Sequence, residues 1–482
     1  MSTPSRREFV KTVAAVAGAA LLPHALGCQP LRGRSAPARI RIAEEHGWER
    51  VPSILARIKP PTISRREFPV TRYGAKADGA TDCTDAFRRA IAACADAGGG
   101  RVVVSGGAFL TGPIHLRSRV NLEVQEGATI RFSTDPKAYE QYVLTRFEGV
   151  ELMGLSPLIY ASNATDVAIT GRGTLDGQSS RSVWWPWKGQ TAHGWTRGTP
   201  HQGPARARLF DMAERNVPVA SRRFGVDSYL RPPFIQPYGC TNVLIEDVTI
   251  RNSPMWEINP VLCRNVIVRG VRIETHGPNN DGCDPESCRD VLIERCHFDT
   301  GDDCIAIKSG RNADGRRVDV PTENVVVRDC EMRDGHGGVT IGSEISGHVR
   351  HVYVERCRMD SPQLDRALRL KNNAMRGGTL EHIYMRDVEV GQLADAVLQV
   401  DFLYEEGANG NFRPVVRDVE LLRVTSKKSK HVLYLRGYEQ GTIADVRVID
   451  CTFDGVERPD VIEHVTGLVR RNVTVNGAKM PR

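Results

Sequence analysis

Three carboxylates dominate the chemistry that this chain of 482 residues could carry out. Asp281 lies in Asn279-Asn280-Asp281-Gly282, and Asp302 and Asp303 are adjacent in Gly301-Asp302-Asp303-Cys304. Grouped carboxyl groups can divide acid–base work, because one stays protonated as an acid while another activates a water molecule. Like charges on one face raise a pKa in the direction that such an acid needs. A glycosidic bond can be cleaved in this way, with acid and base about 6.5–9.5 Å apart in inverting enzymes.

A histidine and two cations follow the acids. His336 lies between two glycines, and Arg369-Leu370-Lys371 places two basic residues one apart. His336 can hold a proton close to an acid. Alternation along a strand points Arg369 and Lys371 to the same face. Such a pair can bind a substrate carboxylate, with Arg369 as a fork and Lys371 as a point charge.

Regular spacing connects these residues. The steps between Asp281, Asp303, His336, Arg369 and Tyr404 are 22, 33, 33 and 35 residues. A repeating chain stacks its equivalent positions, and adjacent parallel strands lie about 4.8 Å apart. We therefore expect all five residues to share one phase of a repeat and to line one groove. Taken singly, each motif is as well explained by a turn, a loop or a solvated strand.

The repeat itself is visible as a short signature. A polar residue precedes alternating β-branched residues in Asn242-Val-Leu-Ile-Glu-Asp, and related segments begin at Asp166, Asn265, Asp290, Asn324, His351, His382, Asp418 and Asp445. This period-two pattern is typical of strands with one buried face. Units of about 20–35 residues are shorter than a propeller blade of about 40. The sequence predicts an all-β fold, a parallel β-helix.

Two segments depart from the repeat. Residues 82–97 are rich in alanine, with Phe87, Ile91 and Ala95 on one helical face and glycines after them, which predicts a short helix that caps the N-terminal end of the solenoid. Residues 179–230 form an insertion with four of the six tryptophans. These rings could contact a sugar or pack the insertion onto the solenoid. We expect one catalytic β-helix domain over residues 60–475.

Composition excludes several classes of function. The formal charge of +7 is a mild excess for this length, and the absence of a run of Lys or Arg argues against a nucleic-acid partner. The 12 cysteines lack paired C-x-x-C spacing, so a zinc site is not expected. They are expected to be buried in the rungs or to form one or two disulfides. No protein partner is implied.

The N-terminus is typical of an export signal. Arg6 and Arg7, with Phe9 and Lys11, precede a short apolar stretch that ends at Leu22, and the paired arginines resemble a twin-arginine signal. Cys28 resembles a lipoprotein cleavage site, whereas Ala36-Pro37-Ala38 offers a competing site without a lipid anchor. We expect residues 1–38 to be an export signal and linker. The mature protein would then be periplasmic or at the cell surface of a bacterium.

Asn-x-Asp-Gly, Gly-Asp-Asp-Cys, Gly-His-Gly and Arg-x-Lys, in this order and spacing, resemble the polygalacturonase family of glycoside hydrolases, family 28. The likeness runs from about Tyr73 to Phe453 and includes Gly171-Arg172-Gly173-Thr174-Leu175-Asp176-Gly177. The resemblance implies a right-handed parallel β-helix that hydrolyses α-1,4-galacturonosidic bonds of pectin with inversion, without a cofactor or metal. The long insertion and the extended segment from Asn279 to Glu286 resemble exo-acting bacterial members.

The resemblance also implies roles for the residues. Asp302 would be the general acid, Asp281 and Asp303 would activate water, and His336 would assist the acid. The substrate would be held by Arg369, Lys371, Tyr404 and Asn279. Asn280 stands where threonine is usual, and Cys304 matches a cysteine that is often disulfide-bonded, for which Cys330 is a substitute partner.

Three other functions remain open at this stage. A related family member could hydrolyse rhamnogalacturonan or another pectic side chain. A pectate lyase on a similar solenoid would depend on calcium. A carbohydrate-binding solenoid would have no catalysis, although it has no need for acids, histidine and Arg-x-Lys together.

Overall fold

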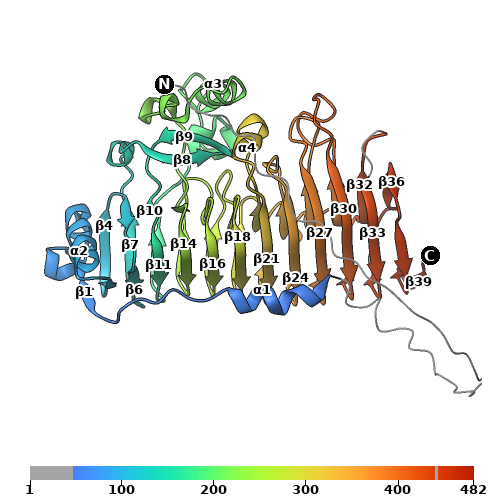
Figure 1. The fold of residues 1–482 in the computed structure, drawn as a ribbon, viewed down its shortest axis with the longest axis horizontal. Helices are drawn as coiled ribbons and strands as arrows, with labels where there is room; N and C mark the ends of the chain where they lie inside the picture. The colour runs from blue at the N-terminus through green and yellow to red at the C-terminus, as the bar shows by residue number, and fades with distance from the viewer. Residues whose placement is uncertain (1–46, 440–442, 482) are drawn as a thin grey trace, which may run out of the picture. The chain divides into compact units, whose positions relative to one another are not determined.

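The protein, described by a computed structural model, is a parallel β-helix. Residues 47–439 and 443–481 are described, so the twin-arginine segment, Cys28 and Ala36-Pro37-Ala38 lie outside the described residues. Three sheets run side by side, and each turn of the chain adds a strand to them (Figure 1). The predicted right-handed parallel β-helix is confirmed. No helix in the described range has the length and apolar character needed to cross a membrane.

The first sheet holds the strands that begin with the repeated signature. In spatial order they are β1 (Glu67–Pro69), β3 (Gly100–Val104), β6 (Val120–Val124), β11 (Thr165–Thr170), β14 (Thr241–Glu246), β16 (Arg264–Arg269), β18 (Arg289–Glu294), β21 (Thr322–Arg328), β24 (Val349–Glu355), β27 (Thr379–Arg386), β30 (Val415–Leu422), β33 (Ile443–Ile449) and β36 (Val465–Thr466), with β37 (Val469–Arg471) also beside β33.

The second sheet follows in each turn. Its strands are β2 (Asp78–Asp82), β4 (Gly107–Thr111), β7 (Ala128–Phe132), β12 (Thr174–Asp176), β15 (Thr249–Arg251), β17 (Arg272–Thr275), β19 (His297–Thr300), β22 (Glu331–Met332), β25 (Arg358–Met359), β28 (Glu389–Val390), β31 (Thr425–Ser426), β34 (Thr452–Phe453), β38 (Thr474–Val475) and β39 (Ala478–Lys479). Only β38 and β39 pair antiparallel in it.

The third sheet carries the polar residues of interest. Its strands are β5 (Ile114–Leu116), β10 (Ile159–Ser162), β13 (Ile235–Tyr238), β20 (Ile305–Ile307), β23 (Val339–Ile341), β26 (Arg366–Lys371), β29 (Ala396–Asp401), β32 (His431–Arg436) and β35 (Val461–Glu463). Single bridges through Ile258 and Cys283 connect β13 to β20. The antiparallel hairpin β8 (Val143–Phe147) and β9 (Val150–Gly154) stands apart from the three sheets.

Helices are few and lie outside the coil. They are α1 (Val51–Arg57), α2 (Thr84–Asp96), α3 (Gly203–Glu214) and α4 (Asn312–Val318), with 3-10 turns η1 (Trp48–Arg50), η2 (Val70–Tyr73), η3 (Pro136–Tyr139), η4 (Trp185–Lys188), η5 (Thr191–His193), η6 (Val219–Ser221) and η7 (Val226–Ser228). The predicted capping helix is α2, whose Phe87, Ala90 and Ile91 are buried at the N-terminal end of the coil (Figure 1).

The repeated signature marks a corner of the coil. Its first residue has positive φ in each copy, for example 59° at Asn242 and 57° at Asn265. Asn and Asp tolerate this left-handed conformation better than other non-glycine residues. Their amides also stack, since Asn265 Nδ2 donates to Asn242 Oδ1 over 2.7 Å and Asn242 Nδ2 donates to Asp166 Oδ1 over 2.9 Å. The polar residue therefore turns the chain and links successive turns.

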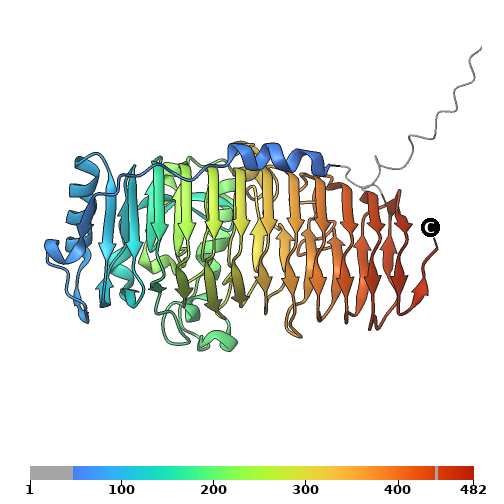
Figure 2. The same ribbon diagram turned by 90° about the horizontal axis from the view of Figure 1, so that it is seen from below.

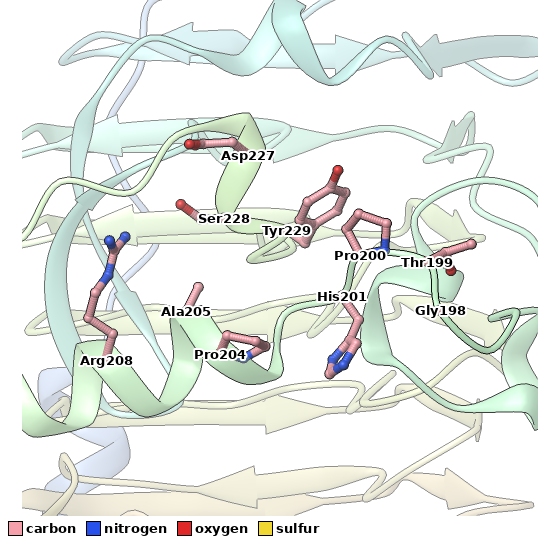
Figure 3. Close-up of a pocket in the computed structure, with 10 residues that line it drawn as sticks. All are labelled: Gly198, Thr199, Pro200, His201, Pro204, Ala205, Arg208, Asp227, Ser228 and Tyr229. Atoms are coloured by element: carbon pink, nitrogen blue, oxygen red, sulfur yellow. The ribbon is translucent and has the colours of Figure 1, made fainter.

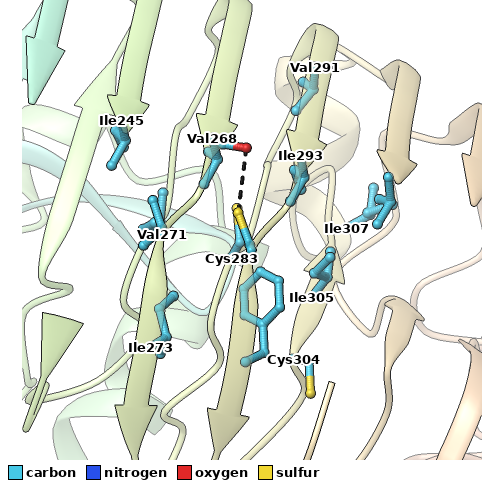
Figure 4. Packing of buried hydrophobic residues seen from close by; sticks show 14 of the residues in the cluster. Ile245, Val268, Val271, Ile273, Cys283, Val291, Ile293, Cys304, Ile305 and Ile307 are labelled. Carbon is cyan, nitrogen blue, oxygen red and sulfur yellow. Dashed lines mark hydrogen bonds between the residues drawn. The ribbon is translucent and has the colours of Figure 1, made fainter. Parts of the chain in front are cut away.

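The interior is a set of apolar columns that run through successive turns. Val243, Val266 and Val291 occupy the same register of the first sheet and are at most 1% exposed. Figure 4 shows neighbouring members of this core, with Ile293 and Ile305 facing each other across the interior. Each turn can bury its apolar face only on the next turn, so the stack is stable as a whole.

The cysteines belong to this interior. The eleven described cysteines are all buried and free. Cys330 lies with Cys296 and Cys357 in a sulfur ladder, whereas Cys304 Sγ faces the carbonyl of Asp334 at 3.5 Å. The bridge between Cys304 and Cys330 considered from the sequence is therefore wrong, because the two sulfurs point to different columns.

A second apolar stripe lies on the outer side of the first sheet. Ile267, Leu292 and Val326 share one register there, and they are covered by α1 with Trp48 and Ile54 (Figures 1 and 2). This helix precedes residue 60, where the sequence analysis starts the catalytic domain. Period-two patterning assigns one buried face per strand, so it does not anticipate a cover on the other face.

The insertion packs mainly on itself and on the hairpin β8–β9. Trp184 is buried and makes edge-to-face contacts with Tyr139 and Trp187, at 5.6 and 4.8 Å between ring centres. Trp187 in turn meets Tyr229 at 5.1 Å. Trp184 and Tyr139 belong to the apolar core of the solenoid and Trp187 packs against it, so these rings pack the insertion onto the solenoid, which is one of the two roles that the sequence left open.

Candidate active site

Two of the acids lie side by side, as the spacing predicts. Cys283 pairs with Ile305 across adjacent turns, so the residues two places earlier, Asp281 and Asp303, occupy the same position on neighbouring rungs. The backbone N–H of Gly282 donates to the Asp303 carbonyl over 3.0 Å and fixes this register.

The other residues do not share that phase, so the expectation of one common phase is wrong in part. Ile305 pairs with Val339, which places His336 beside Asp302 and one residue away from the phase of Asp303. Arg369 of β26 pairs with Thr340 of β23, and Tyr404 lies in the loop after β29.

The cations nevertheless reach the acids through their long side chains. Lys371 Nζ donates to Asp303 Oδ2 over 2.8 Å, and Arg369 Nη1 donates to Oδ1 over 3.5 Å. Thr340 Oγ1 adds a third bond to Oδ1 over 2.7 Å. Although burial raises the pKa of the Asp303 carboxyl, the charges of Lys371 and Arg369 hold it well below its usual range. Tyr404 lies over both cations, with its ring centre 5.3 Å from Lys371 Nζ.

Asp302 forms a hydrogen-bonded ion pair with His336. Nδ1 of His336 lies 3.0 Å from Asp302 Oδ1, and the backbone N–H of Asp303 donates to the same oxygen over 3.0 Å. This bond raises the pKa of His336 to about 9. Burial raises the pKa of Asp302, but His336 outweighs it and the net shift is downward. Oδ2 of Asp302 accepts no hydrogen bond from the described residues, so it is the oxygen left for a ligand.

Asp281 has the opposite electrostatics. Burial, and then the charge of Asp302, raises its pKa well above the usual range. Its nearest cation is Lys308, with 3.6 Å between Nζ and Oδ2, and Oδ1 is buried without a partner among the described residues. The surroundings therefore favour the protonated form of Asp281 and the ionised form of Asp302 beside His336.

Sequence reasoning missed Lys308. It is buried, contacts Glu344 at 3.3 Å and lies 4.5 Å from the centre of the Trp256 ring. The signal was present, because Cys304-Ile-Ala-Ile-Lys308 and Ala367-Leu-Arg-Leu-Lys371 end in lysine at the same place in two repeats.

The structural role of Asn280 was also underestimated. Its side chain bonds the backbone of Gly277, Ser253 and Met255 and so holds the segment before Asp281.

Asn279 faces the insertion. Its Oδ1 accepts from Lys188 Nζ over 2.7 Å and from Arg231 Nη2 over 2.8 Å. Trp185 anchors the same region, because its indole N–H donates to the Ser253 carbonyl over 2.9 Å. A Cβ at Gly277 would lie 2.3 Å from this ring, so only glycine permits the approach. Neither Lys188 nor Arg231 was identified from the sequence, since both lie outside the repeat.

The three acids form one compact cluster. One oxygen from each of Asp281, Asp302 and Asp303 lies within 4.8 Å of the others. The separation usual in inverting glycosidases is about 6.5–9.5 Å, so the expectation of inversion rests on the family resemblance and not on this distance. The oxygens are near enough to surround a cation, but Lys308, Arg369 and Lys371 already supply positive charge at the cluster.

A separate cavity of about 530 Å³ lies within the insertion. Figure 3 shows its lining, with Thr199 and His201 on one segment, Arg208 on α3, and Asp227 and Tyr229 opposite. Asp281, Asp302 and Asp303 do not line this cavity. Size alone therefore does not locate the chemistry, which follows from the charged side chains on the third sheet.

A parallel β-helix that gathers acids, a histidine and an Arg-Lys pair beside its third sheet defines the class of the protein, a solenoid with one charged site. Residues 225–471 match the family described as glycosyl hydrolases family 28. This match covers just over half of the chain. The chain belongs to glycosyl hydrolases family 28.

Known relatives agree with this assignment. A "Probable polygalacturonase" of Vitis vinifera is 30% identical over 325 residues, which are 65% of this chain and 58% of that protein. An exo-poly-alpha-D-galacturonosidase of Dickeya chrysanthemi is 28% identical over 70% of this chain and 57% of its own length. The chain thus spans somewhat over half the length of these two relatives.

Among solved structures, a hyperthermoactive exopolygalacturonase from Thermotoga maritima superimposes with a TM-score of 0.88 at 44% identity. The superposition covers 90% of this chain and 97% of that one. A family 28 exopolygalacturonase from Yersinia enterocolitica, with a TM-score of 0.68 at 22% identity, shares the fold.

Proposed function

We propose that this protein hydrolyses α-1,4-galacturonosidic bonds of pectic oligosaccharides from the chain end. The observation that carries the proposal is the joint placement of Asp302, with its free Oδ2, and the cations Arg369 and Lys371 at one acid cluster. An acid beside a buried cation pair suits a sugar that bears a carboxylate. The 44% identity to an exopolygalacturonase over nearly the whole chain supports the same substrate.

In the proposed reaction Asp302 protonates the leaving oxygen through Oδ2. Without substrate the ionised form of Asp302 is favoured. His336 supplies a proton nearby, because its Nδ1 lies 3.0 Å from Asp302 Oδ1 and its pKa is raised to about 9. Binding of an anionic sugar expels water and adds a like charge, and both effects raise the pKa of Asp302. A proton shared by the pair can then pass to the leaving group.

Water is the second reactant, and it adds to the anomeric carbon as the glycosidic bond breaks. Asp303 stays ionised and orients the water. Asp281 passes its proton to Asp302 as the substrate binds, and it then accepts the proton that the water loses. The proton lost by the water balances the proton gained by the leaving oxygen. We propose inversion of the anomeric centre on the basis of the family alone.

Exo action is supported by the insertion. Trp185, Lys188 and Arg231 contact the segment Gly277–Asn279 just before Asp281, and they occupy the N-terminal side of the acids along the stack. If these residues leave room for one sugar beyond the acids, a chain that enters from the C-terminal side is cleaved after its terminal sugar. The released product would then be the monomer.

The cellular location remains a proposal based on the sequence. The signal-like residues 1–38 support export by the twin-arginine route to the periplasm or cell surface. A lipid at Cys28 would be detected as a mass increase on the mature N-terminus. Processing after Ala38 would remove Cys28 and leave no such increase.

A product time course tests the function. With a defined hexagalacturonide, we expect galacturonate alone as the first product, without unsaturated sugars and without loss of rate in a chelator. A ladder of lengths from the start would contradict exo action, and an unsaturated product would indicate a lyase. Binding without release of reducing ends would favour the carbohydrate-binding alternative, whereas cleavage of rhamnogalacturonan only would favour the other hydrolase.

A further inference from the structure

Lys188 is a half-buried cation of the insertion that the mechanism above does not use. Its Nζ donates to Asn279 Oδ1 over 2.7 Å, which leaves two of its three N–H donors. No ion pair within 4.0 Å joins Lys188 to a carboxylate of the described residues. A half-buried ammonium group with two open donors can take a further hydrogen-bond acceptor.

Lys188 lies among two further cations, Arg231 and Arg206, and two carboxylates, Glu148 and Asp302, so the group as a whole carries one positive charge more than negative. Arg231 is 1% exposed, and it donates to Asn279, to Gln202 and to the carbonyls of Pro254 and Pro278 without meeting a carboxylate. The nearby Glu148 is bound by Arg206 at 2.6 Å. Burial, followed by the charges of Arg231 and Arg206, lowers the pKa of Lys188, while Glu148 and Asp302 oppose this shift. An added anion would relieve this imbalance.

Lys188 and the pair Arg369–Lys371 lie on opposite sides of the acids along the stack. Asn279, the partner of Lys188, precedes Asp281 on its rung, whereas Arg369 and Lys371 lie three rungs further on, beyond Asp303 and His336. At about 4.8 Å for each rung, the backbone positions of Asn279 and Arg369 are about 14 Å apart along the stack, and the side chains of Arg369 and Lys371 reach back from there to Asp303. A galacturonan has one carboxylate on every sugar, so the two cationic groups are suited to sugars on either side of the cleaved bond.

We propose that Lys188 binds the carboxylate of the terminal sugar, the one that is released, and thereby selects chains that end in a uronic acid. The assignment to the terminal sugar follows from the insertion, since Trp185, Arg231 and Asn279 surround Lys188 on the closed side. Lys188 is a specificity-determining residue, and Asn279 and Arg231 position its ammonium group. This inference rests on the proposed exo-hydrolysis of galacturonans.

The test compares two substrates with the Lys188→Met variant. One substrate is trigalacturonide, and the other is the same trimer with the carboxyl of its nonreducing terminal sugar reduced to an alcohol. On trigalacturonide we expect kcat/KM to fall by about 10- to 100-fold, as for a lost hydrogen bond to a charged group. On the reduced trimer, wild type and variant should agree within about threefold. Lys188→Arg should recover part of the loss on trigalacturonide only.

Controls separate the possible failures. Lys76→Met, which removes an exposed lysine near the N-terminal cap, should behave as wild type on both substrates. If Lys188→Met does not fold, Lys188→Gln, which keeps a donor for Asn279, gives the same comparison. An equal loss on both substrates would mean a structural role and would overturn the proposal, as would no loss on either. A wild type that cleaves neither trimer would instead overturn the proposed function, and the proposal with it.

Discussion

Replacing Asp302 by Asn is the most direct probe of the site, because it removes an ionisable group and keeps its shape. Oδ1 of Asp302 accepts from His336 and from the backbone of Asp303, both at 3.0 Å. An asparagine oxygen can accept both bonds in the same place. What is lost is the charge that holds the proton on His336 and the proton that Oδ2 would deliver.

The size of both effects follows from the structure. General acid catalysis contributes about 10²- to 10⁴-fold, so kcat should fall by about that factor with KM changed less than about threefold. The pKa of His336, raised to about 9 mainly by Asp302, should fall toward its ordinary value of about 6.5. Because the imidazole is 54% exposed, solvent screens part of this coupling. We expect a fall of at least about one pKa unit, which corresponds to about 1.4 kcal/mol.

Two measurements check this prediction. Initial rates on trigalacturonide give kcat and KM, and an NMR titration of the histidine ring signals gives the pKa, with His336→Gln identifying the signal. Asp85→Asn, at an exposed acid on α2, serves as the matched control. A kcat within tenfold of wild type would refute the role of Asp302 as acid, and an unmoved pKa of His336 would refute the ion pair.

Three further predictions concern stability, pH and product pattern. Lys371→Met should lower the free energy of unfolding by at least about 1 kcal/mol in a urea titration. The loss should be smaller than the about 3–5 kcal/mol of an isolated buried pair, because Arg369 and Thr340 still contact Asp303. An unchanged midpoint would contradict the buried pair. His336→Gln should be less stable than wild type below about pH 6.5, and the difference should disappear as the pH rises through about 9. The reason is that a raised histidine pKa stabilises the folded state only while the ring is protonated. A difference in stability that persists at pH 10 would exclude this linkage. Gly277→Ala should displace Trp185, whose ring lies 2.3 Å from the added Cβ. Chromatography of a hexagalacturonide digest should then show longer products beside the monomer. Monomer alone would show that this contact does not close the site.

The fold could be predicted from the sequence because each turn of a solenoid obeys the same local rule. The polar residue that starts each signature turns the chain with positive φ, and the β-branched residues after it enter the core. Both requirements recur in every turn, so the pattern repeats in the sequence. The capping helix Thr84–Asp96 is predicted for a similar reason, since its apolar spacing of four residues is local.

The site was predicted only in part. The phase of the repeat placed Asp281 beside Asp303 correctly, because both lie two residues before the paired Cys283 and Ile305. It failed for Arg369 and Tyr404, since loops between strands differ in length and long side chains reach across rungs. The functional role of Lys371 was expected, but its direct bond to Asp303 was not.

By itself, the sequence determined the repeat, the buried face of each strand, the family motifs and the identity of the acids. These features depend on neighbours within one turn of the chain, and they are therefore encoded locally. Only the tertiary structure decided that the pKa of Asp281 is raised and that of Asp302 is lowered, because both depend on burial and on charges from other turns. The same holds for Lys188 and Arg231, which no repeat marks and which packing of the insertion brings to Asn279.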